Sequence, residues 1–425
     1  MNLTIRINKN RYVQYCIWIE LFLVCFSGGL IDIVGLPSVI KYFPDLINII
    51  LMLYLLKRLT GISKPQKDVN RITVFILVFI LLSFILWFAN MGSIALLLWG
   101  ARNTFRFLLF FIAVVQFWTM YDVEKMCKYI NPLLIVNFLL CIFEYFILGY
   151  SGDYVGGGFG VSQGCNAPLN VLLVVVTVYN AVRFMQKRQK LGKTVLYIAL
   201  CSGISGMAEL KVYVVEVVMV VLIVGAFSKG FMKKLLLVIA GMAFAFASIH
   251  FIETLIPGWE GFFTIENMYK MISSKNGYDN SGDLNRLTAI SELNRMFFKN
   301  GINIIGLGLG NCEYSDTFSF LNSSFYKQFG FLHYAWFSVA KVYLELGWFG
   351  ICSHFFIWIY TFWVSIKKVV SAEIKIIVAS MALFSGFFFF YNFTMNLEAA
   401  YIIYSVLAIS YISLKEKSIL LKKEY

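Results

Sequence analysis

Long, nearly uninterrupted apolar segments recur along the chain and are separated by polar stretches. A helix needs about 20 predominantly apolar residues to cross the hydrocarbon core of a bilayer. The pattern therefore predicts an all-α fold, a polytopic transmembrane helical bundle of about twelve spans that forms a single integral membrane domain over residues 1–425. The predicted spans cover roughly residues 12–31, 38–56, 72–90, 94–118, 130–150, 167–185, 193–208, 210–227, 235–252, 334–366, 373–391 and 398–414.

One polar connection is much longer than the others. Residues 253–333 separate two apolar segments, whereas connections in compact proteins are usually a few residues long. Periodic apolar positions inside this connection predict that it folds, partly as helix, on the membrane surface. A shorter connection at residues 151–166 is rich in glycine, which predicts a flexible turn.

Positive charge alternates from one connection to the next. Lysine and arginine accumulate in the cytoplasmic connections of membrane proteins. If the N-terminus is cytoplasmic, most of the 36 lysines and arginines fall in cytoplasmic segments, and the opposite connections near 32–37, 91–93, 151–166 and 392–397 contain none. We therefore expect a multi-pass protein of the cytoplasmic (inner) membrane with both termini in the cytoplasm and with 253–333 as a large extracytoplasmic loop.

The composition supports a membrane protein over a nucleic-acid-binding protein. The chain is 60% hydrophobic and 14% charged, and its net charge is +13. Soluble domains have about 45–50% apolar and about 25% charged residues, so this much apolar surface needs the lipid bilayer as its partner. A net positive charge can indicate a nucleic-acid partner. Here the alternation of charge accounts for the excess, and we expect no nucleic-acid partner.

The sequence lacks the usual motifs for metals and nucleotides. The eight cysteines form no CxxC pair and no Cys/His cluster with zinc-like spacing. No Walker, HExxH or GxSxG motif is present. We therefore expect chemistry that uses neither a metal nor another cofactor. Cys165 and Cys312 both fall in predicted outside connections, where they would be either a disulfide or two free thiols.

Arg102 and Arg106 belong to a predicted span, where ionisable side chains are costly and therefore functional candidates. Their spacing puts both on one helix face. Together they could bind a phosphate or a carboxylate that approaches from outside. The alternatives are that they pair with acids of the membrane region such as Glu144 or Asp45, or that Arg102 lies at the interface.

Lys211 lies at the outer end of another predicted span. It either extends its ammonium group to the membrane surface or contacts a substrate. Glu209 and Glu216 lie nearby in sequence and are candidate structural partners of the arginines.

The long connection contains an arginine on an unexpected helix face. Asp283 is a suitable N-cap for a helix over residues 284–299. In that helix Arg286 would lie in the middle of the apolar face, whereas Arg295 would lie on the polar face. An inward arginine needs a partner, because a buried unpaired charge is costly. The two candidates are a lipid pyrophosphate and a protein carboxylate.

Two further features follow in the same connection. The segment Gly306–Gly310 alternates glycine and leucine, and such turns can offer backbone N–H groups to phosphate. We interpret it as a tight turn, because nucleotides are on the other side of the membrane. His333 stands where the connection meets the next helix. A histidine there could act as a general base, or it could be structural.

The order of these segments resembles the bacterial O-antigen polymerases and O-antigen ligases. The resemblance covers roughly residues 99–350. It rests on the segments Trp99–Arg106, Asn285–Ile290, Phe298–Asn311, His333–Trp336 and Lys341–Gly350.

The resemblance implies a metal-independent glycosyltransferase that polymerises polyprenyl-pyrophosphate-linked oligosaccharide repeat units into surface polysaccharide such as O-antigen, capsule or exopolysaccharide. Arg286 would then stabilise the departing pyrophosphate and His333 would accept the acceptor proton. Lys211, Arg102 and Arg106 would bind substrate. Ligase-like members carry an arginine where this chain has Lys211, and this difference favours a polymerase.

Two alternatives follow from the same sequence. One is an O-antigen ligase, which transfers a finished glycan to another acceptor. The other is a polysaccharide flippase or secondary transporter, although transporters often contain two repeated halves and this chain shows no internal repeat. The resemblance also implies a flippase and a chain-length regulator as protein partners of a polymerase.

Overall fold

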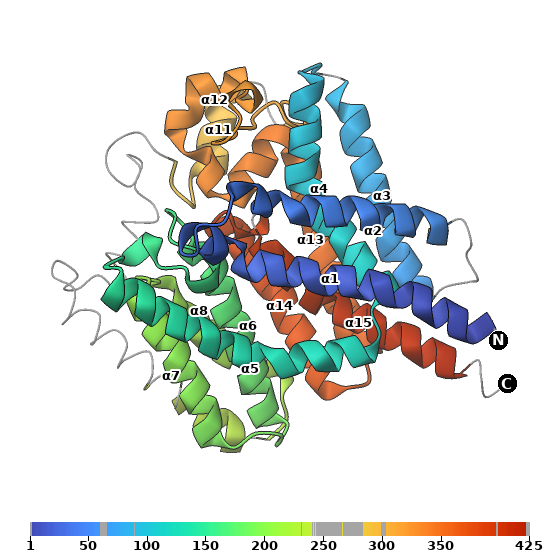
Figure 1. The fold of residues 1–425 in the computed structure, drawn as a ribbon, viewed down its shortest axis with the longest axis vertical. Coiled ribbons are helices and arrows are strands. Elements are labelled where there is room, and N and C mark those ends of the chain that lie inside the picture. Colours follow the sequence, from blue (N-terminus) through green and yellow to red (C-terminus); the bar gives the residue numbers. More distant parts are fainter. Residues whose placement is uncertain are drawn as a thin grey trace.

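The computed structural model describes residues 2–59, 66–88, 90–230, 232–239, 241, 243, 266, 284–298, 303–396 and 398–421. Within these residues every regular element is a helix and no strand occurs, so the predicted all-α class is confirmed (Figure 1). The principal helices are α1 (Asn2–Asp32), α2 (Phe43–Leu59), α3 (Lys67–Trp87), α4 (Ile94–Phe117), α5 (Met120–Ile142), α6 (Asn166–Met185), α7 (Leu191–Met207), α8 (Val212–Phe227), α11 (Ala289–Phe297), α12 (Ser324–Phe329), α13 (Ser338–Lys368), α14 (Ala372–Tyr391) and α15 (Ala399–Leu421).

Eight helices in the described part of the chain are long and apolar enough to cross a membrane. They are Arg11–Asp32, Ser38–Lys57, Lys67–Trp87, Ile94–Phe117, Met120–Ile147, Asn166–Met185, Ser338–Lys368 and Ala372–Tyr391. The predicted spans 193–208 and 210–227 form α7 and α8, which are shorter apolar helices of 17 and 16 residues. The predicted span 398–414 lies in α15, and most of 235–252 lies outside the described residues.

Helix α5 begins ten residues before the predicted span at 130–150. Its start is fixed by a capping interaction in which Asp122 accepts hydrogen bonds from the backbone N–H of Thr119, at 3.0 Å, and from its hydroxyl, at 2.8 Å. Such a reciprocal cap satisfies donors that the first turn would otherwise leave unpaired. Hydropathy alone does not detect it, because the first two turns of α5 are polar.

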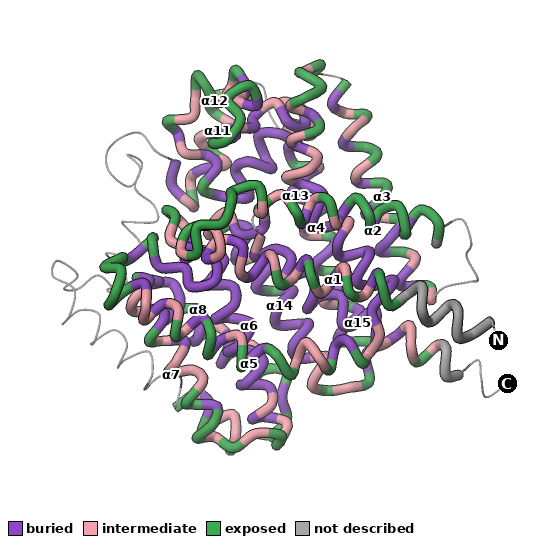
Figure 2. Tube along the Cα trace, viewed as in Figure 1, coloured by how far each residue is buried: buried purple, intermediate pink, exposed green. Residues whose placement is uncertain are grey.

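The side chains of the central helices are buried by neighbouring helices, whereas many side chains of the outer helices are exposed. Helix α6 is buried over 94% of its apolar segment, whereas α2 is buried over only 22%. Figure 2 shows the same contrast between the interior and the outer faces of the bundle. The large side chains of Leu46, Ile49 and Leu53 on α2 are all exposed. An apolar surface of this extent is stable in lipid and not in water.

The helix ends next to the lysine- and arginine-rich connections gather at one end of the molecule. The side chain of Gln14 in α1 donates to the carbonyl of Phe117 at the end of α4, at 3.1 Å. Lys415 in α15 donates to three carbonyls at the same end of α4, among them that of Trp118 at 2.7 Å. The start of α1 and the end of α15 lie near each other on this side (Figure 1). We refer to it as the basic end.

The connections without lysine or arginine meet at the opposite end. Asp32 at the end of α1 accepts from the backbone N–H of Val161 at 2.9 Å. Trp99 near the start of α4 donates to the carbonyl of Tyr314 at 3.0 Å, and Ser338 at the start of α13 donates to the carbonyl of Asn392 at 3.0 Å. The structure therefore separates the two classes of connection that alternate along the sequence.

The described parts of the long connection pack on this second end and contain helices α11 and α12. The helix expected over 284–299 begins only at Ala289, so this prediction was wrong at its start. Residues 286–288 form a turn, because Leu284 donates its N–H to the carbonyl of Leu332 at 3.2 Å and holds the chain beside that segment. The expected cap, Asp283, lies outside the described residues.

Candidate functional site

Arg286 lies in the turn before α11 and packs against the ends of two apolar helices. Its Nε donates to the carbonyl of Tyr391, the last residue of α14, at 2.7 Å. Its guanidinium lies 4.4 Å from the centre of the Tyr391 ring and 5.5 Å from that of Phe337. Burial lowers the pKa of Arg286. A guanidinium with little water around it interacts strongly with a nearby anion.

One backbone hydrogen bond joins the segments that contain Arg286 and His333. The backbone N–H of Leu284 donates to the carbonyl of Leu332, the residue before His333. The Arg286 guanidinium lies over the ring of Phe337, four residues after His333. The His333 backbone is left-handed, with φ 51° and ψ 33°. Its half-buried ring stacks on Trp336 at 4.1 Å. This backbone region is costly for a residue with a side chain, and such strain is often retained at functional sites.

Lys211 immediately precedes α8 and is half-buried. The carboxylates of Glu209 and Asp153 interact electrostatically with its ammonium group. Asp153 also interacts electrostatically with Tyr391, whose ring Arg286 covers. Arg286 therefore contacts Tyr391 at the end of α14 directly, Lys211 shares the neighbour Asp153 with Tyr391, and His333 lies in the segment that is bonded to that of Arg286. We call Lys211, Arg286, His333 and Tyr391 the Arg286 cluster.

Arg102 and Arg106 lie apart from this cluster and are paired within the protein. The Nη2 of Arg102 is 2.7 Å from the carboxylate of Asp45 on α2. Arg106 is 3.6 Å from the same carboxylate and 3.4 Å from that of Glu398. The alternative that these arginines pair with Asp45 is thus confirmed. The other candidate acid, Glu144, instead accepts from the backbone of the glycine-rich connection.

A buried ion pair lies beside these arginines and was not identified from the sequence. The ammonium of Lys341 on α13 is 2.5 Å from the carboxylate of Glu313, and both side chains are almost fully buried. Asn103, between the two arginines, donates to the other oxygen of Glu313 at 2.9 Å. The detectable signal was Lys341 itself, because a lysine inside an apolar segment requires a partner.

These side chains line a cavity of about 210 Å³, which we call the Arg102 pocket. Four cations, Lys41, Arg102, Arg106 and Lys341, border it. Three acids border it as well, Glu313, Asp316 and Glu398, and Asp45 pairs with its arginines. Because the positive and negative charges balance among the described residues, this pocket suits a neutral polar ligand better than a free anion.

The connection between α14 and α15 joins the pocket to the Arg286 cluster. Tyr391 contacts Arg286, and two residues later the ring of Phe393 lies 5.3 Å from the Lys341 ammonium. Glu398, further along, pairs with Arg106. The two groups of side chains therefore lie on the two sides of one short segment.

The glycine segment forms a turn that packs on the protein. Gly306, Gly308 and Gly310 all have positive φ. Gly308 donates its N–H to the carbonyl of Glu345 at 3.0 Å, and Gly306 donates to the side chain of Asn303 at 3.0 Å. These N–H groups are used within the protein, which agrees with a tight turn.

The cysteines and acids offer no metal centre in the described residues. No group of three His, Cys, Asp or Glu side chains there could hold a metal ion. Cys165 and Cys312 are both buried free thiols, and burial raises the pKa of each. Of the two alternatives, the structure therefore contains two free thiols and not a disulfide.

Comparison with protein-family models gives no match, and comparison with curated protein sequences gives none either. A functional conclusion for this chain therefore depends on its own residues and their geometry.

Proposed function

We propose that this protein is a membrane glycosyltransferase that polymerises polyprenyl-pyrophosphate-linked oligosaccharide repeat units into surface polysaccharide. The observation that carries the proposal is the packing of Arg286 on Tyr391, beside the segment that contains His333, at the end of the bundle opposite the basic end. Lipid-linked pyrophosphates present their charged group at the membrane surface. A desolvated arginine beside the ends of apolar helices suits that chemistry.

The proposal includes a topology of about twelve spans in the cytoplasmic membrane. The basic end faces the cytoplasm, together with both termini. Residues 253–333 then form the large extracytoplasmic loop, and both candidate sites open to the outside. Support comes from the separation of the lysine-rich and lysine-poor connections onto opposite ends of the molecule.

Arg286 and Lys211 would act on the donor. The bond between the anomeric carbon of the growing glycan and its pyrophosphate breaks, and the bonding electrons leave with the pyrophosphate. Cationic donors that are fixed in place stabilise this developing negative charge more in the transition state than in the ground state. Arg286 is oriented for this role by its bond to the Tyr391 carbonyl.

His333 would act on the acceptor, a sugar hydroxyl of the next lipid-linked repeat. The hydroxyl oxygen forms the new bond to the anomeric carbon, and its proton passes to the imidazole. Stacking on Trp336 holds the ring in one orientation. The sugar–pyrophosphate bond supplies the free energy, so the step needs no nucleotide.

Arg102 and Arg106 would contribute to substrate binding through the Arg102 pocket. Because Asp45 and Glu398 already neutralise them, we assign the pocket to the uncharged sugars of a repeat unit and not to the pyrophosphate. Paired charged side chains provide both donors and acceptors for sugar hydroxyls.

Substitution of the two central residues tests the proposal. We expect Arg286→Ala and His333→Ala to abolish polymer formation, because they remove the pyrophosphate contact and the general base. Arg295→Ala is the matched control, since Arg295 is exposed and pairs with Glu292 on the surface of α11. Surface-glycan gels at equal amounts of membrane-inserted protein give the readout. Equal loss in all three variants, or in none, contradicts the assignment.

Deletion of the gene separates the proposed activity from its alternatives. A glycan that stops at a single repeat unit identifies a polymerase. Long chains that stay on the carrier lipid identify a ligase with the same donor site. Accumulation of lipid-linked repeats on the cytoplasmic leaflet identifies a flippase and overturns the proposal.

A further inference from the structure

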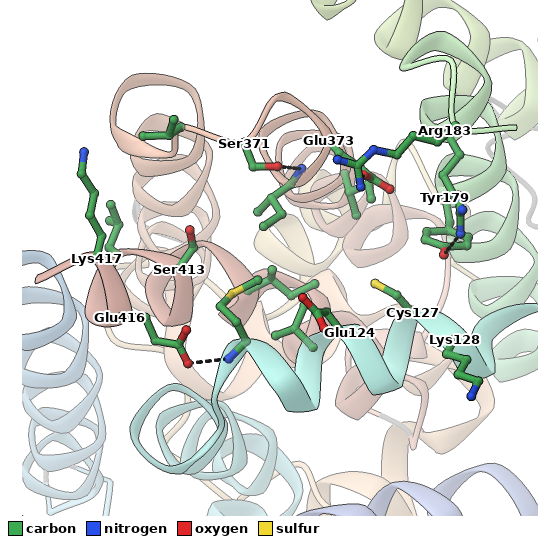
Figure 3. Close-up of a pocket in the computed structure, with 18 of the residues that line it drawn as sticks. Glu124, Cys127, Lys128, Tyr179, Arg183, Ser371, Glu373, Ser413, Glu416 and Lys417 are labelled. Atoms are coloured by element: carbon green, nitrogen blue, oxygen red, sulfur yellow. Dashed lines mark hydrogen bonds and ion pairs between the residues drawn. The ribbon is translucent and has the colours of Figure 1, made fainter. Parts of the chain in front are cut away.

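A larger cavity of about 840 Å³ lies at the basic end (Figure 3). It shares no lining residue with the Arg102 pocket. Its walls come from α5, α6, the start of α14 and the end of α15. Figure 3 shows Arg183 and Tyr179 on α6 at one side and Glu124, Cys127 and Lys128 on α5 below them. None of these residues takes part in the proposed glycosyl transfer.

Half of the charged side chains that line this cavity are already matched within the protein. Arg188 pairs with Glu373 at 2.8 Å, and Lys368 pairs with Asp68 at 2.6 Å. The carboxylate of Glu416 accepts from the backbone N–H of Met120, the first residue of α5, at 2.6 Å. These groups therefore stabilise the helix ends and leave little charge for a ligand.

Arg183 is different. Its Nη1 donates to the hydroxyl of Tyr179 at 2.6 Å, and its guanidinium lies 5.3 Å from that ring. Its Nε is buried without a hydrogen-bond partner. Arg183 forms no ion pair with any acid in the described part of the chain. Arg183 therefore has a positive charge that no acid in the described residues neutralises by a direct ion pair, and such a charge favours an anionic ligand.

The rim of the cavity is charged, whereas its interior surface is apolar. Lys128 and Lys417 lie exposed at its rim, where one exposed acid, Glu124, opposes them. The interior surface is apolar and includes Val123, Ile377 and Ile409. A soluble anion would gain nothing from this apolar wall. A lipid offers a phosphate to the cations and an acyl chain to the wall, and basic pockets between helices on the cytoplasmic side bind anionic head groups.

We infer that this cavity is a binding site for a phosphate-bearing ligand, the head group of an anionic phospholipid, with Arg183 as the direct phosphate ligand. Lys128 adds attraction at the rim. The inference is independent of the proposed glycosyltransferase activity, because it rests on residues at the other end of the molecule. Its function would be to fix α5, α6, α14 and α15 together at the membrane surface.

Lipid binding by the full-length protein tests this inference. Purified wild-type protein is delipidated and titrated with phosphatidylglycerol or phosphatidylcholine, and bound lipid is counted by native mass spectrometry. We expect the wild type to favour phosphatidylglycerol. Arg183→Gln should weaken that binding at least about fivefold, which is the loss of one cationic contact. Arg71→Gln, an exposed arginine outside the cavity at the basic end, should leave it unchanged.

A second variant and a second ligand complete the experiment. If Arg183→Gln fails to fold, Lys128→Gln replaces it, because Lys128 is exposed and contributes only to the rim. Inorganic phosphate is titrated in place of lipid, and its binding at comparable affinity would assign the site to a free phosphate instead of a lipid head group. Equal binding of phosphatidylcholine, or equal loss in Arg183→Gln and Arg71→Gln, would overturn the inference.

Discussion

At the scale of single residues, the buried pair of Lys341 and Glu313 controls the electrostatics of the Arg102 pocket. The two side chains hold each other in an almost fully buried place, and Asn103 satisfies the second carboxylate oxygen. Removal of one partner from a buried pair leaves an uncompensated charge, whereas replacement of both partners by neutral groups is often tolerated. The pair therefore behaves as a unit.

We predict that Glu313→Gln and Lys341→Met each destabilise the protein by about 3–5 kcal/mol. The double variant should be more stable than either single variant, because neither charge is then left unpaired. The stability of the three variants is measured as the thermal unfolding of the detergent-solubilised protein, monitored by size-exclusion chromatography. Additive losses in the double variant would show that the two residues are not coupled.

Lys211 is assigned to the donor pyrophosphate through its positive charge. We predict that Lys211→Gln lowers polymer formation in isolated membranes, because a neutral side chain no longer attracts pyrophosphate. Lys211→Arg should keep its activity, since arginine stays charged. Equal activity of Lys211→Gln and the wild type would exclude a charged role for Lys211.

At the scale of elements, the break inside α13 positions the long connection. Gly347 has φ 59° and ψ −152°, a combination reserved for glycine. After this break, Trp348 and Phe349 donate their N–H groups to the carbonyls of Asn303 and Ile304, at 3.0 and 2.9 Å. A broken helix survives at membrane depth only if other protein groups satisfy its backbone, and the segment 303–308 does so here.

We predict that Gly347→Ala prevents correct folding. An added Cβ would meet the carbonyl oxygen of Asn303 and the nitrogen of Gly306, both at 2.7 Å, on a backbone that disfavours any side chain. Gly225→Ala in α8 is the matched control, because nothing lies within 4 Å of its added Cβ. Membrane insertion and monodispersity in detergent give the readout. Similar yields of both variants would contradict this role of the break.

At the scale of the whole molecule, the two ends differ in charge. The basic end contains the first turns of α3 and α5 and the last turns of α13 and α15, and the candidate sites lie at the other end. Lysine- and arginine-rich ends of membrane proteins usually face the cytoplasm, and the proposed topology follows this rule.

We predict that single cysteines introduced at the two ends are labelled from opposite sides. In a cysteine-free background, Ser319→Cys, exposed near the candidate sites, should react with an impermeant thiol reagent in intact cells. Lys417→Cys, exposed at the basic end, should react only after permeabilisation. The reverse pattern would place both candidate sites in the cytoplasm and overturn the proposed function.

The sequence by itself determined the helical class, most helix positions and the separation of two kinds of connection. It also identified the intramembrane arginines as residues that need partners. These properties can be determined locally. The hydropathy of a segment depends only on consecutive residues, and a charged side chain inside an apolar segment is costly whichever partner it later finds. The start of α5 was missed because a polar cap, and not an apolar run, begins that helix.

Only the tertiary structure decided which partner each charged residue takes. Arg102 pairs with Asp45 from another helix, and Lys341 pairs with Glu313 from the long connection. Arg286 lies in a turn and not on a helix face, because Leu284 is held by the distant carbonyl of Leu332. These choices depend on contacts between segments far apart in the chain, and helical periodicity contains no information about such contacts.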